Sequence, residues 1–318
     1  MAHEANNRAQ RLALQDVTVI VVTFNSAHCL PTLGHALFDC PNILFADNGS
    51  QDETLQAITK HLPHARVLAL GRNLGFGAAN NRALAAVSTP FALLLNPDCE
   101  ISGSEICQLM DVARAYPDAA VVAPQLIQAS GKPEVNYRWP LTHWSPKGPP
   151  AEGLCCVGFV CGAAMLFNVR VTAATGYFDE RFFLYYEDDD LCLRLFKAKL
   201  PILLAPHIRV THRSRGSVKG STPLRHEYLR GFHHAQSKLI FAHKHQGATQ
   251  AYAQRTRLLL GTALALPFRI LFPSPRLIAR MWGRLRGLID WKSLTLAKQK
   301  TTAAVSTNQL LQNLGRSR

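Results

Sequence analysis

The sequence lacks the patterns that mark several large classes of protein. Its eight cysteines form no CxxC pair, and it has no P-loop, no G-x-S-x-G elbow and no H-E-x-x-H motif. The N-terminus, MAHEANNRAQ, lacks the apolar run of a signal peptide. The longest apolar stretch, 258–267, is far shorter than the ~20 residues that a membrane-spanning helix needs. These absences argue against a disulfide framework and the corresponding enzyme classes, and they predict a cytoplasmic protein.

Acidic residues are scarce in the last third of the chain. The 318 residues carry 35 Lys and Arg against 21 Asp and Glu, a formal net charge of +14. Residues 1–218 are nearly balanced, with 18 basic and 19 acidic side chains, whereas residues 219–318 hold 17 basic and 2 acidic ones. The positive excess is therefore a property of the C-terminal region. It predicts an anionic partner, either a membrane surface or a nucleic acid.

Apolar segments of strand length alternate with segments of helix length in the first part of the chain. The strand candidates are 17–23, 43–47, 65–70 and 91–96. Continuous apolar strands separated by helices indicate a parallel sheet with both faces covered. Helix N-caps are predicted at Asn25-Ser26 and at Ser50, which stands three residues before Glu53 as in a capping box.

The rest of the chain adds a loop and further elements. Residues 130–153, rich in Pro and Gly, predict a long irregular segment that is either functional or a linker. Strand candidates follow at 157–167 and 201–206, and helix candidates at 224–245 and 277–291. The last of these is amphipathic, so its apolar face either packs on the protein itself or lies in a membrane surface.

Polar residues follow each of the first four strand candidates. They are Thr23 and Asn25, Asp47, Asn73, and Asp98. The carboxyl ends of parallel strands share one edge where ligands bind, so these residues predict a common site. Asp47 suits a base or ribose hydroxyl, and Asp98 suits a divalent cation that carries a diphosphate. Either residue taken alone is also typical of an ordinary Asx turn.

Four adjacent acids, residues 187–190, open a helical pattern. Like charges at this density are unfavourable unless a cation, a helix N-terminus or catalysis uses them. Asp190 and Arg194 are spaced for an i,i+4 ion pair, which leaves Glu187 and Asp188 for chemistry. A carboxylate beside an acceptor hydroxyl can act as a general base.

Two further features are ambiguous on their own. His212 follows a short strand candidate and is either a metal ligand or an ordinary core or surface histidine. Gly75-Phe76-Gly77 imitates a dinucleotide fingerprint, but Asn80 replaces the third glycine and the motif follows the third strand candidate instead of the first. The pattern therefore argues against a dehydrogenase.

Taken in order, the motifs resemble glycosyltransferase family 2, the inverting enzymes of GT-A fold, and especially its bacterial rhamnosyltransferase-like members. The resemblance covers about residues 17–212 and rests on VIVVTFNS (19–26), FADNGSQDET (45–54), NLGFGAANN (73–81), LLLNPD (93–98), CGAAMLF (161–167), GYFDERFFLYYEDDDLCLR (176–194) and His212. It implies an α/β fold with a Rossmann-type, mostly parallel sheet flanked by helices. The implied organisation is an N-terminal tail (1–16), a GT-A catalytic domain (17–223) and a basic, membrane-associating helical region (224–318). The nucleotide half of the catalytic domain would span about 17–125 and its acceptor half about 154–223.

The resemblance also implies a role for each matching residue. The nucleotide would be held by Thr23, Asn25, Asp47, Asn73, Gly75 and Asn80. Asp98 and His212 would bind Mg²⁺ or Mn²⁺, and Asp188 would be the catalytic base. The acceptor or sugar would lie against Gly162, Ala163 and Glu187. A loop containing Arg213, Arg215 and Lys219 is predicted to close over the diphosphate.

The activity implied is inverting transfer of a sugar from a nucleotide-diphosphate sugar, with dTDP-rhamnose as the suggested donor. The acceptor would be a saccharide or lipid-linked glycan of the cell surface, reached from the inner face of the cytoplasmic membrane. Arg and Lys interleaved with Leu, Ile and Trp in the C-terminal region favour an anionic membrane over a nucleic acid as partner. The alternatives are another nucleotide-sugar enzyme and a catalytically silent, membrane-associated scaffold.

Overall fold

A computed structural model describes residues 12–135, 137, 150–213, 216, 223–271 and 274–291. The chain divides into two compact units. The first, here called the sheet unit, comprises Met1–Glu180 and Glu187–Gly220. The second, the helical unit, comprises Arg181–Tyr186 and Ser221–Arg318. The short segment 181–186 therefore belongs with the C-terminal helices although it lies far from them in sequence.

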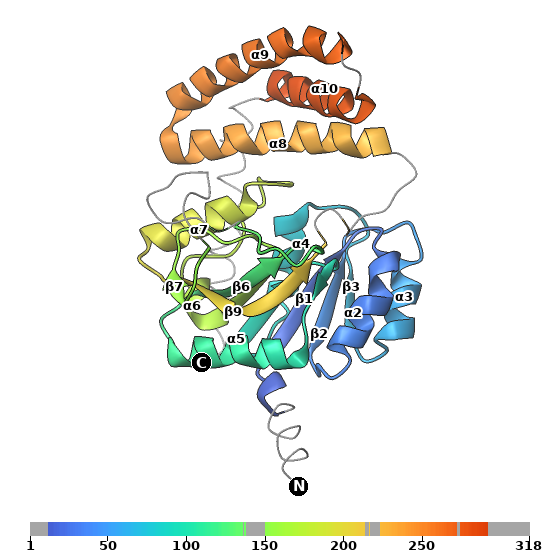
Figure 1. The fold of residues 1–318 in the computed structure, drawn as a ribbon, viewed down its shortest axis with the longest axis vertical. Helices are drawn as coiled ribbons and strands as arrows, with labels where there is room; N and C mark the ends of the chain where they lie inside the picture. The colour runs from blue at the N-terminus through green and yellow to red at the C-terminus, as the bar shows by residue number, and fades with distance from the viewer. Residues whose placement is uncertain are drawn as a thin grey trace, which may run out of the picture. The chain divides into compact units, whose positions relative to one another are not determined.

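The described part of the sheet unit contains one mixed sheet of nine strands (Figure 1). The strands are β1 (Val17–Thr23), β2 (Ile43–Asp47), β3 (Arg66–Ala69), β4 (Phe91–Leu95), β5 (Cys99–Glu100), β6 (Val121–Ile127), β7 (Cys155–Cys156), β8 (Ala164–Asn168) and β9 (Ile202–His212). Their order is β3-β2-β1-β4-β8-β6-β9-β5, and β7 pairs with β9. Strands β1 to β4 are mutually parallel, whereas β8 runs antiparallel to both β4 and β6.

Helices cover both faces of this sheet, as the sequence predicts. The helical elements of the sheet unit are η1 (Ala27–Cys29), α2 (Leu30–Leu37), α3 (Thr54–His61), α4 (Phe76–Leu84), α5 (Gly103–Ala115), α6 (Val169–Ala173) and α7 (Glu187–Lys197). Alternate side chains of a strand point to opposite faces. Val19 and Val21 accordingly belong to the core under α2, α3 and α5, whereas Ile20 belongs to the core under α4 and α7. The expected GT-A-like α/β architecture is confirmed.

Strand β6 was not predicted, because Pro124 stands in its middle and proline has no N–H to donate to a sheet. All seven residues of β6 are buried, and the strand lies between β8 and β9. The register of β6 against β9 shifts between Pro124 and Gln125. This irregularity accommodates the proline inside the sheet.

Two local predictions are wrong. The predicted strand over 157–167 is limited to its second half, where β8 begins at Ala164. The side-chain N-caps are absent, because Ser26 and Glu53 precede their helices without a side-chain cap hydrogen bond. The hydroxyl of Ser50 instead bonds the carboxylate of Asp47, so this serine serves the strand end and not the helix.

The helical unit contains α8 (Pro223–Gln246), α9 (Ala248–Leu271) and α10 (Pro275–Asp290), which lie side by side (Figure 1). The two helices predicted at 224–245 and 277–291 correspond to α8 and α10. Glycines allow these two backbones to approach closely. A Cβ on Gly231 of α8 would fall on the carbonyl oxygen of Arg280, and a Cβ on Gly283 of α10 would fall on that of Tyr228.

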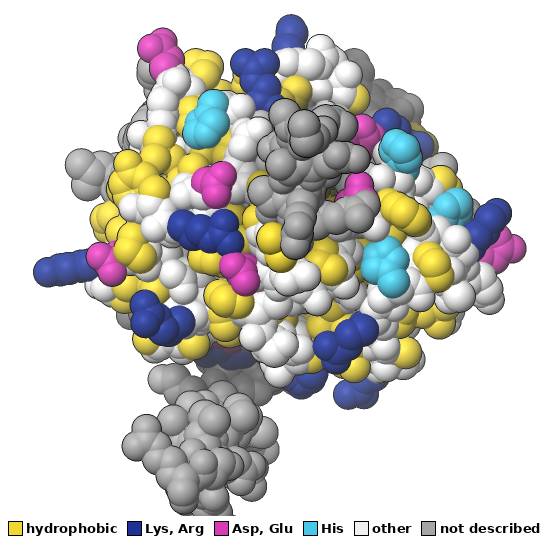
Figure 2. Space-filling view, turned by 90° about the horizontal axis from the view of Figure 1, so that it is seen from below, with side chains coloured by type: hydrophobic (Ala, Val, Ile, Leu, Met, Phe, Trp, Pro, Cys, Tyr) yellow, Lys and Arg dark blue, Asp and Glu magenta, His cyan; other side chains and the backbone are white. Residues whose placement is uncertain are grey.

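Within the described ranges, no helix combines the length and apolarity needed to cross a membrane. All eight cysteines lie within the described residues, and none of them forms a disulfide. The face drawn in Figure 2 carries basic, acidic and histidine side chains scattered among apolar ones, with no gathering of one sign among the described residues that are visible. The predicted location inside the cell rests on the patterns that the sequence lacks, and the predicted membrane association rests on the basic composition of residues 219–318.

Candidate active site

The carboxyl ends of β1 and β2 are joined through Asp47. Thr23 and Asp47 are partners in the register of the two strands, and the Thr23 hydroxyl donates to Oδ1 of Asp47 at 3.1 Å. The backbone N–H of Ser50 donates to Oδ2 at 3.0 Å, and the Ser50 hydroxyl donates to Oδ1 at 2.5 Å. Asp47 is buried, and a buried carboxylate needs such partners. The three donors hold this acid in one orientation at the sheet edge.

The loops that follow β1 and β2 are also tied to each other. The N–H of Asn25 donates to the Ser50 hydroxyl at 2.9 Å, and the Asn25 side-chain oxygen accepts the N–H of Gln51 at 2.8 Å. Asn25 has a φ of 53°, in the left-handed region that few non-glycine residues adopt. Two hydrogen bonds from the neighbouring loop keep it there. The structure therefore brings Thr23, Asn25 and Asp47 together, as predicted.

Asn48, which the sequence analysis did not single out, connects this edge to the loop after β3. Its side-chain amide donates to Oδ1 of Asn73 at 3.0 Å, and its Oδ1 accepts the N–H of Leu74 at 2.7 Å. Gly75, with a φ of 94°, precedes α4 and donates its N–H to Oδ1 of Asn73 at 3.0 Å. The sequence signal for Asn48 was its place directly after Asp47.

Asn80 lies inside α4 and is almost fully buried. Its side-chain amide donates to the carbonyl of Phe76, one turn earlier in the same helix, at 3.0 Å. The structure therefore brings Asn73 and Gly75 to the edge formed by β1 and β2, whereas the amide of Asn80 bonds within α4.

Asp98 and His212 meet because β5 pairs with β9, with Cys99 opposite His212. Oδ1 of Asp98 lies 3.8 Å from Nε2 of His212. That oxygen is buried and, among the described residues, has no hydrogen-bond partner, whereas Oδ2 accepts the N–H of Gly216 at 2.9 Å. A buried carboxylate oxygen normally receives a hydrogen bond. Here the oxygen and the neighbouring imidazole nitrogen could instead serve as two ligands of a divalent cation.

Cys99 also lies within this group, since ligand atoms of Asp98, Cys99 and His212 fall within 4.8 Å of one another. The Cys99 thiol donates to the carbonyl of Ala163 at 3.4 Å. Burial, followed by the charge of Asp98, raises the pKa of this thiol well above its usual value. Mg²⁺ and Mn²⁺ are hard cations that a thiol suits poorly, so Asp98 and His212 remain as the candidates for binding such a cation.

Glu134 lies beside His212 and was not identified from the sequence. Its Oε2 lies 3.5 Å from Nδ1 of His212, the ring nitrogen on the other side from Asp98. A carboxylate at this position fixes the ring and its tautomer in many metal sites. The residue falls in the irregular segment 130–153, whose composition predicted a functional loop or linker but no individual role.

Asp188 stands in the first turn of α7, next to the predicted acceptor turn. Oδ2 accepts the N–H of Gly162 at 3.1 Å, and Oδ1 accepts the N–H of Asp189 at 2.9 Å. The carbonyl of the neighbouring Ala163 accepts the N–H of Asn96, at the end of β4, at 2.8 Å. The structure thus brings Gly162 to the predicted base, and Ala163 to the strand end that precedes Asp98.

Glu187 is a buried acid whose Oε2 has no hydrogen-bond partner among the described residues. Burial raises the pKa of Glu187 well above its usual value, and the charge of Asp188 raises it further. The raised pKa favours the neutral form of Glu187, which reduces the negative charge beside Asp188. The predicted pairing of Asp190 with Arg194 is present, at 2.9 Å.

Of the three predicted loop cations, only Arg213 lies within the described residues. It forms an ion pair with Oε1 of Glu100 at 2.5 Å. Arg215 and Lys219 lie outside the described residues. A cavity of about 280 Å³ adjoins Asp98 here and is lined in part by His28, Pro97 and Arg213. The predicted role of these cations over a diphosphate stays a prediction.

The sheet order, the acidic and amide groups at the strand ends and the Asp98–His212 pair define a GT-A-like α/β protein. Residues 18–173 match the family model described as Glycosyl transferase family 2. The chain therefore carries a family 2 glycosyltransferase domain and is rhamnosyltransferase-like, as the sequence motifs indicate.

Two curated relatives and one solved structure illustrate the likeness. The chain is 29% identical over 239 residues to an N-acetylglucosaminyl-diphospho-decaprenol L-rhamnosyltransferase of Mycobacterium tuberculosis, covering 65% of this chain and 76% of that protein. It is 25% identical over 206 residues to the low-salt glycan biosynthesis hexosyltransferase Agl10 of Haloferax volcanii, covering 61% and 66%. A Pyrobaculum calidifontis mannosyltransferase, solved with GDP-Man and Mn²⁺, superposes with a TM-score of 0.54 at 15% identity, covering 87% and 88%. The last likeness concerns the fold alone.

Proposed function

We propose that the protein transfers a sugar, with inversion, from a nucleotide-diphosphate sugar to a lipid-linked glycan acceptor. We infer dTDP-rhamnose as the donor, in line with the activity named for the mycobacterial relative. The observation that carries the proposal is the buried Oδ1 of Asp98, which lies 3.8 Å from His212 in a family 2 domain and has no hydrogen-bond partner within the described part of the chain. Burying a carboxylate oxygen without a hydrogen bond is unfavourable, and a cation that also binds the donor diphosphate would compensate for this cost.

In the proposed binding mode, the strand ends hold the donor. The Asp47 carboxylate is fixed by Thr23 and Ser50, and it would accept hydrogen bonds from the base or ribose. Asp98 and His212 would hold Mg²⁺ or Mn²⁺, which when bound neutralises charge on the departing nucleotide diphosphate. Glu134 would keep the His212 ring turned toward that site.

The proposed reaction is one displacement at the anomeric carbon. The acceptor hydroxyl oxygen forms the new bond to that carbon while the bond to the diphosphate oxygen breaks, and the electron pair leaves with the diphosphate. The hydroxyl proton passes to the carboxylate of Asp188. The N–H groups of Gly162 and Asp189 hold this carboxylate in place, so little reorganisation is needed when the proton arrives.

The proposed location is peripheral, at the inner face of the cytoplasmic membrane. The support is the C-terminal region, where 17 of the 19 charged residues at 219–318 are basic and lie among Leu, Ile and Trp. A lipid-linked acceptor would be met at that surface.

The deciding experiment measures nucleotide-diphosphate release from UDP-, dTDP- and GDP-sugars, with and without Mg²⁺ or Mn²⁺, in the presence of a lipid-linked acceptor extract. We expect release from dTDP-rhamnose that depends on both the metal and the acceptor. Asp98→Asn should lose metal-dependent donor binding, whereas Asp188→Asn should bind the donor but not turn it over. Absence of release and of any thermal shift with every donor would refute the proposal in favour of a catalytically silent scaffold.

A further inference from the structure

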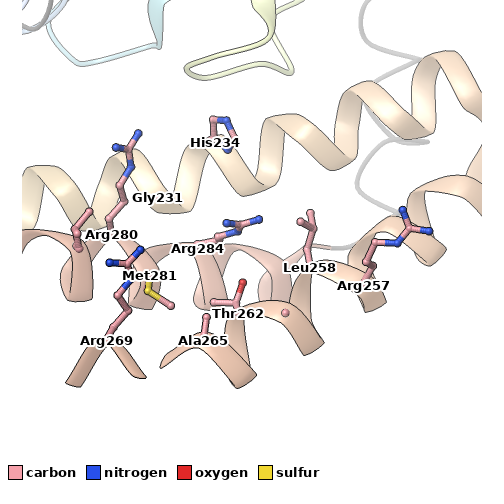
Figure 3. Close-up of a pocket in the computed structure, with 12 residues that line it drawn as sticks. Gly231, His234, Arg257, Leu258, Thr262, Ala265, Arg269, Arg280, Met281 and Arg284 are labelled. Atoms are coloured by element: carbon pink, nitrogen blue, oxygen red, sulfur yellow. The ribbon is translucent and has the colours of Figure 1, made fainter. Parts of the chain in front are cut away.

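The helical unit contains a cavity with an unusual lining. Its volume is about 550 Å³, within the ~300–1,000 Å³ of small-ligand sites. It lies between α8, α9 and α10, and Figure 3 shows the side chains around it. Four arginines border it, Arg257 and Arg269 from α9 and Arg280 and Arg284 from α10. We call this cavity the arginine pocket.

The arginines of this pocket have almost no acidic partners. The helical unit contains two acids, Glu227 and Asp290. Asp290 pairs with Arg286 at 2.7 Å, and Glu227 pairs with Arg230 at 2.8 Å. Glu227 also lies 3.9 Å from Nε of Arg280. The remaining pocket arginines have no ion pair among the described residues, so their charges repel one another unless an anion enters.

A buried hydroxyl in the same pocket also lacks a partner. Thr262 of α9 is 4% exposed, and within the described ranges its Oγ1 has no hydrogen-bond partner. In Figure 3 the Thr262 hydroxyl is directed toward the space that Arg284 also borders. A buried hydroxyl without a partner has lost the hydrogen bonds that it makes in water, and an acceptor oxygen in the pocket would restore one of them.

The remaining surroundings are apolar. Leu258, Ala265, Leu277 and Met281 complete much of the lining. On the adjoining side of α9, Leu260, Leu264 and Phe268 follow one another at i,i+4 spacing and are 60%, 70% and 68% exposed. The ligand that matches both features carries an anionic oxygen cluster and an apolar chain.

We propose that the arginine pocket binds the phosphoryl head group of a membrane lipid, with the acyl or isoprenoid region against Leu260, Leu264 and Phe268. Guanidinium groups bind phosphoryl oxygens in pairs of hydrogen bonds, and the Thr262 hydroxyl donates another. Burial, together with the nearby charges of Lys238, Arg284 and Arg280, lowers the pKa of His234 to about 4, so this lining histidine is neutral and adds no competing cation at neutral pH. The inference deepens the membrane association in the proposed function but needs no sugar transfer.

The test is sedimentation of the full chain with vesicles, without donor or acceptor. The protein should bind phosphatidylcholine vesicles that contain phosphatidic acid. It should bind vesicles of equal surface charge that contain oleate more weakly. Arg284→Gln should weaken binding to phosphatidic acid about tenfold more than Arg276→Gln does. The control residue, Arg276, is an exposed arginine of α10 that does not line the pocket. Thr262→Val, which changes no charge, should weaken it roughly threefold.

Equal losses in Arg284→Gln and Arg276→Gln would overturn the proposal, because they would mean charge attraction without a site. Inorganic phosphate or glycerol 3-phosphate should compete only weakly. Strong competition, with vesicle binding insensitive to Thr262→Val, would assign the pocket to a free phosphate and overturn the lipid assignment. Preference for DNA over vesicles would also overturn it. Unchanged thermal unfolding of each variant establishes that the fold is retained, and donor turnover is measured separately.

Discussion

The backbone N–H of Gly162 donates a hydrogen bond to Oδ2 of Asp188, 3.1 Å away, and joins two segments that are 26 residues apart in sequence. The second carboxylate oxygen accepts the N–H of Asp189. Asp188 is thus held at the start of α7 by two backbone N–H donors, one on each carboxylate oxygen. Asparagine keeps one acceptor oxygen and therefore one of these two hydrogen bonds, so Asp188→Asn removes the basic group with a small change in local structure.

Asp188→Asn should lower the rate of sugar transfer by about 10²–10⁴-fold and leave donor binding unchanged. Asparagine keeps the shape of the side chain but cannot take a proton from the acceptor. The measurement pairs steady-state product formation with calorimetric donor binding. Asp189→Asn, which removes a neighbouring charge from the same helix turn, should retain most of the activity. Full activity in Asp188→Asn would exclude this residue as the base.

Glu134→Gln should weaken Mn²⁺ binding by about tenfold, because the neutral amide holds the His212 ring less firmly than the carboxylate does. Electron paramagnetic resonance of added Mn²⁺ measures this directly. In turnover assays the concentration of metal needed for half-maximal rate should rise, with a smaller change in kcat. Glu180→Gln, at an exposed ion pair with Arg82, is the matched control. An unchanged Mn²⁺ affinity would show that Glu134 does not position His212.

Glu187→Gln should stabilise the protein increasingly as the pH rises. The native state keeps the Glu187 proton because its pKa is raised, whereas the unfolded chain loses it above the ordinary carboxyl value. Between those two values, wild-type stability falls with pH by at most about 1.4 kcal/mol per pH unit, and glutamine removes that loss. Urea unfolding at mildly acidic and mildly alkaline pH tests the trend. If the free energy of unfolding depends on pH in the same way for wild type and Glu187→Gln, the prediction is contradicted. Glu152→Gln, at an exposed glutamate, is the control for removing a carboxylate.

Gly283→Ala should loosen the packing of α8 on α10. The added Cβ would fall on the carbonyl oxygen of Tyr228, and such overpacking costs about 1–3 kcal/mol. Amide hydrogen exchange in α8 and α10 should become faster, since it reports the local opening free energy. Gly261→Ala in α9 is the control, because its Cβ meets no atom within 4 Å. Alanine there should stabilise the helix by roughly 0.5–1 kcal/mol. Unchanged or slower exchange in Gly283→Ala would show that α8 and α10 accommodate the added Cβ without losing packing.

Much of the candidate active site was predictable because it lies at the ends of strands. Continuous apolar runs specified β1, β2 and β4, and the polar residues directly after them meet at one sheet edge by the geometry of parallel strands. Thr23, Asp47 and Asp98 were therefore identified from local sequence alone. Glu187 and Asp188 were singled out because four adjacent acids open a helix, a pattern that is also local, and the resemblance to family 2 then assigned the base to Asp188.

Only the tertiary structure revealed the residues whose roles depend on distant partners. Glu134 matters because β9 carries His212 to it, and Asn48 matters because the loop after β3 returns to β2. Neither pairing leaves a periodic signal in the chain.

The sequence by itself determined the alternation of strands and helices, the acids at the strand ends and the positive excess at 219–318, because apolar periodicity and charge are properties of contiguous residues. The tertiary structure alone decided that Pro124 lies within a strand, that Ser50 serves Asp47 instead of a helix, and that four arginines share one pocket with Thr262. These outcomes depend on which elements pack together, and packing is set by the sum of many long-range contacts that no short segment encodes.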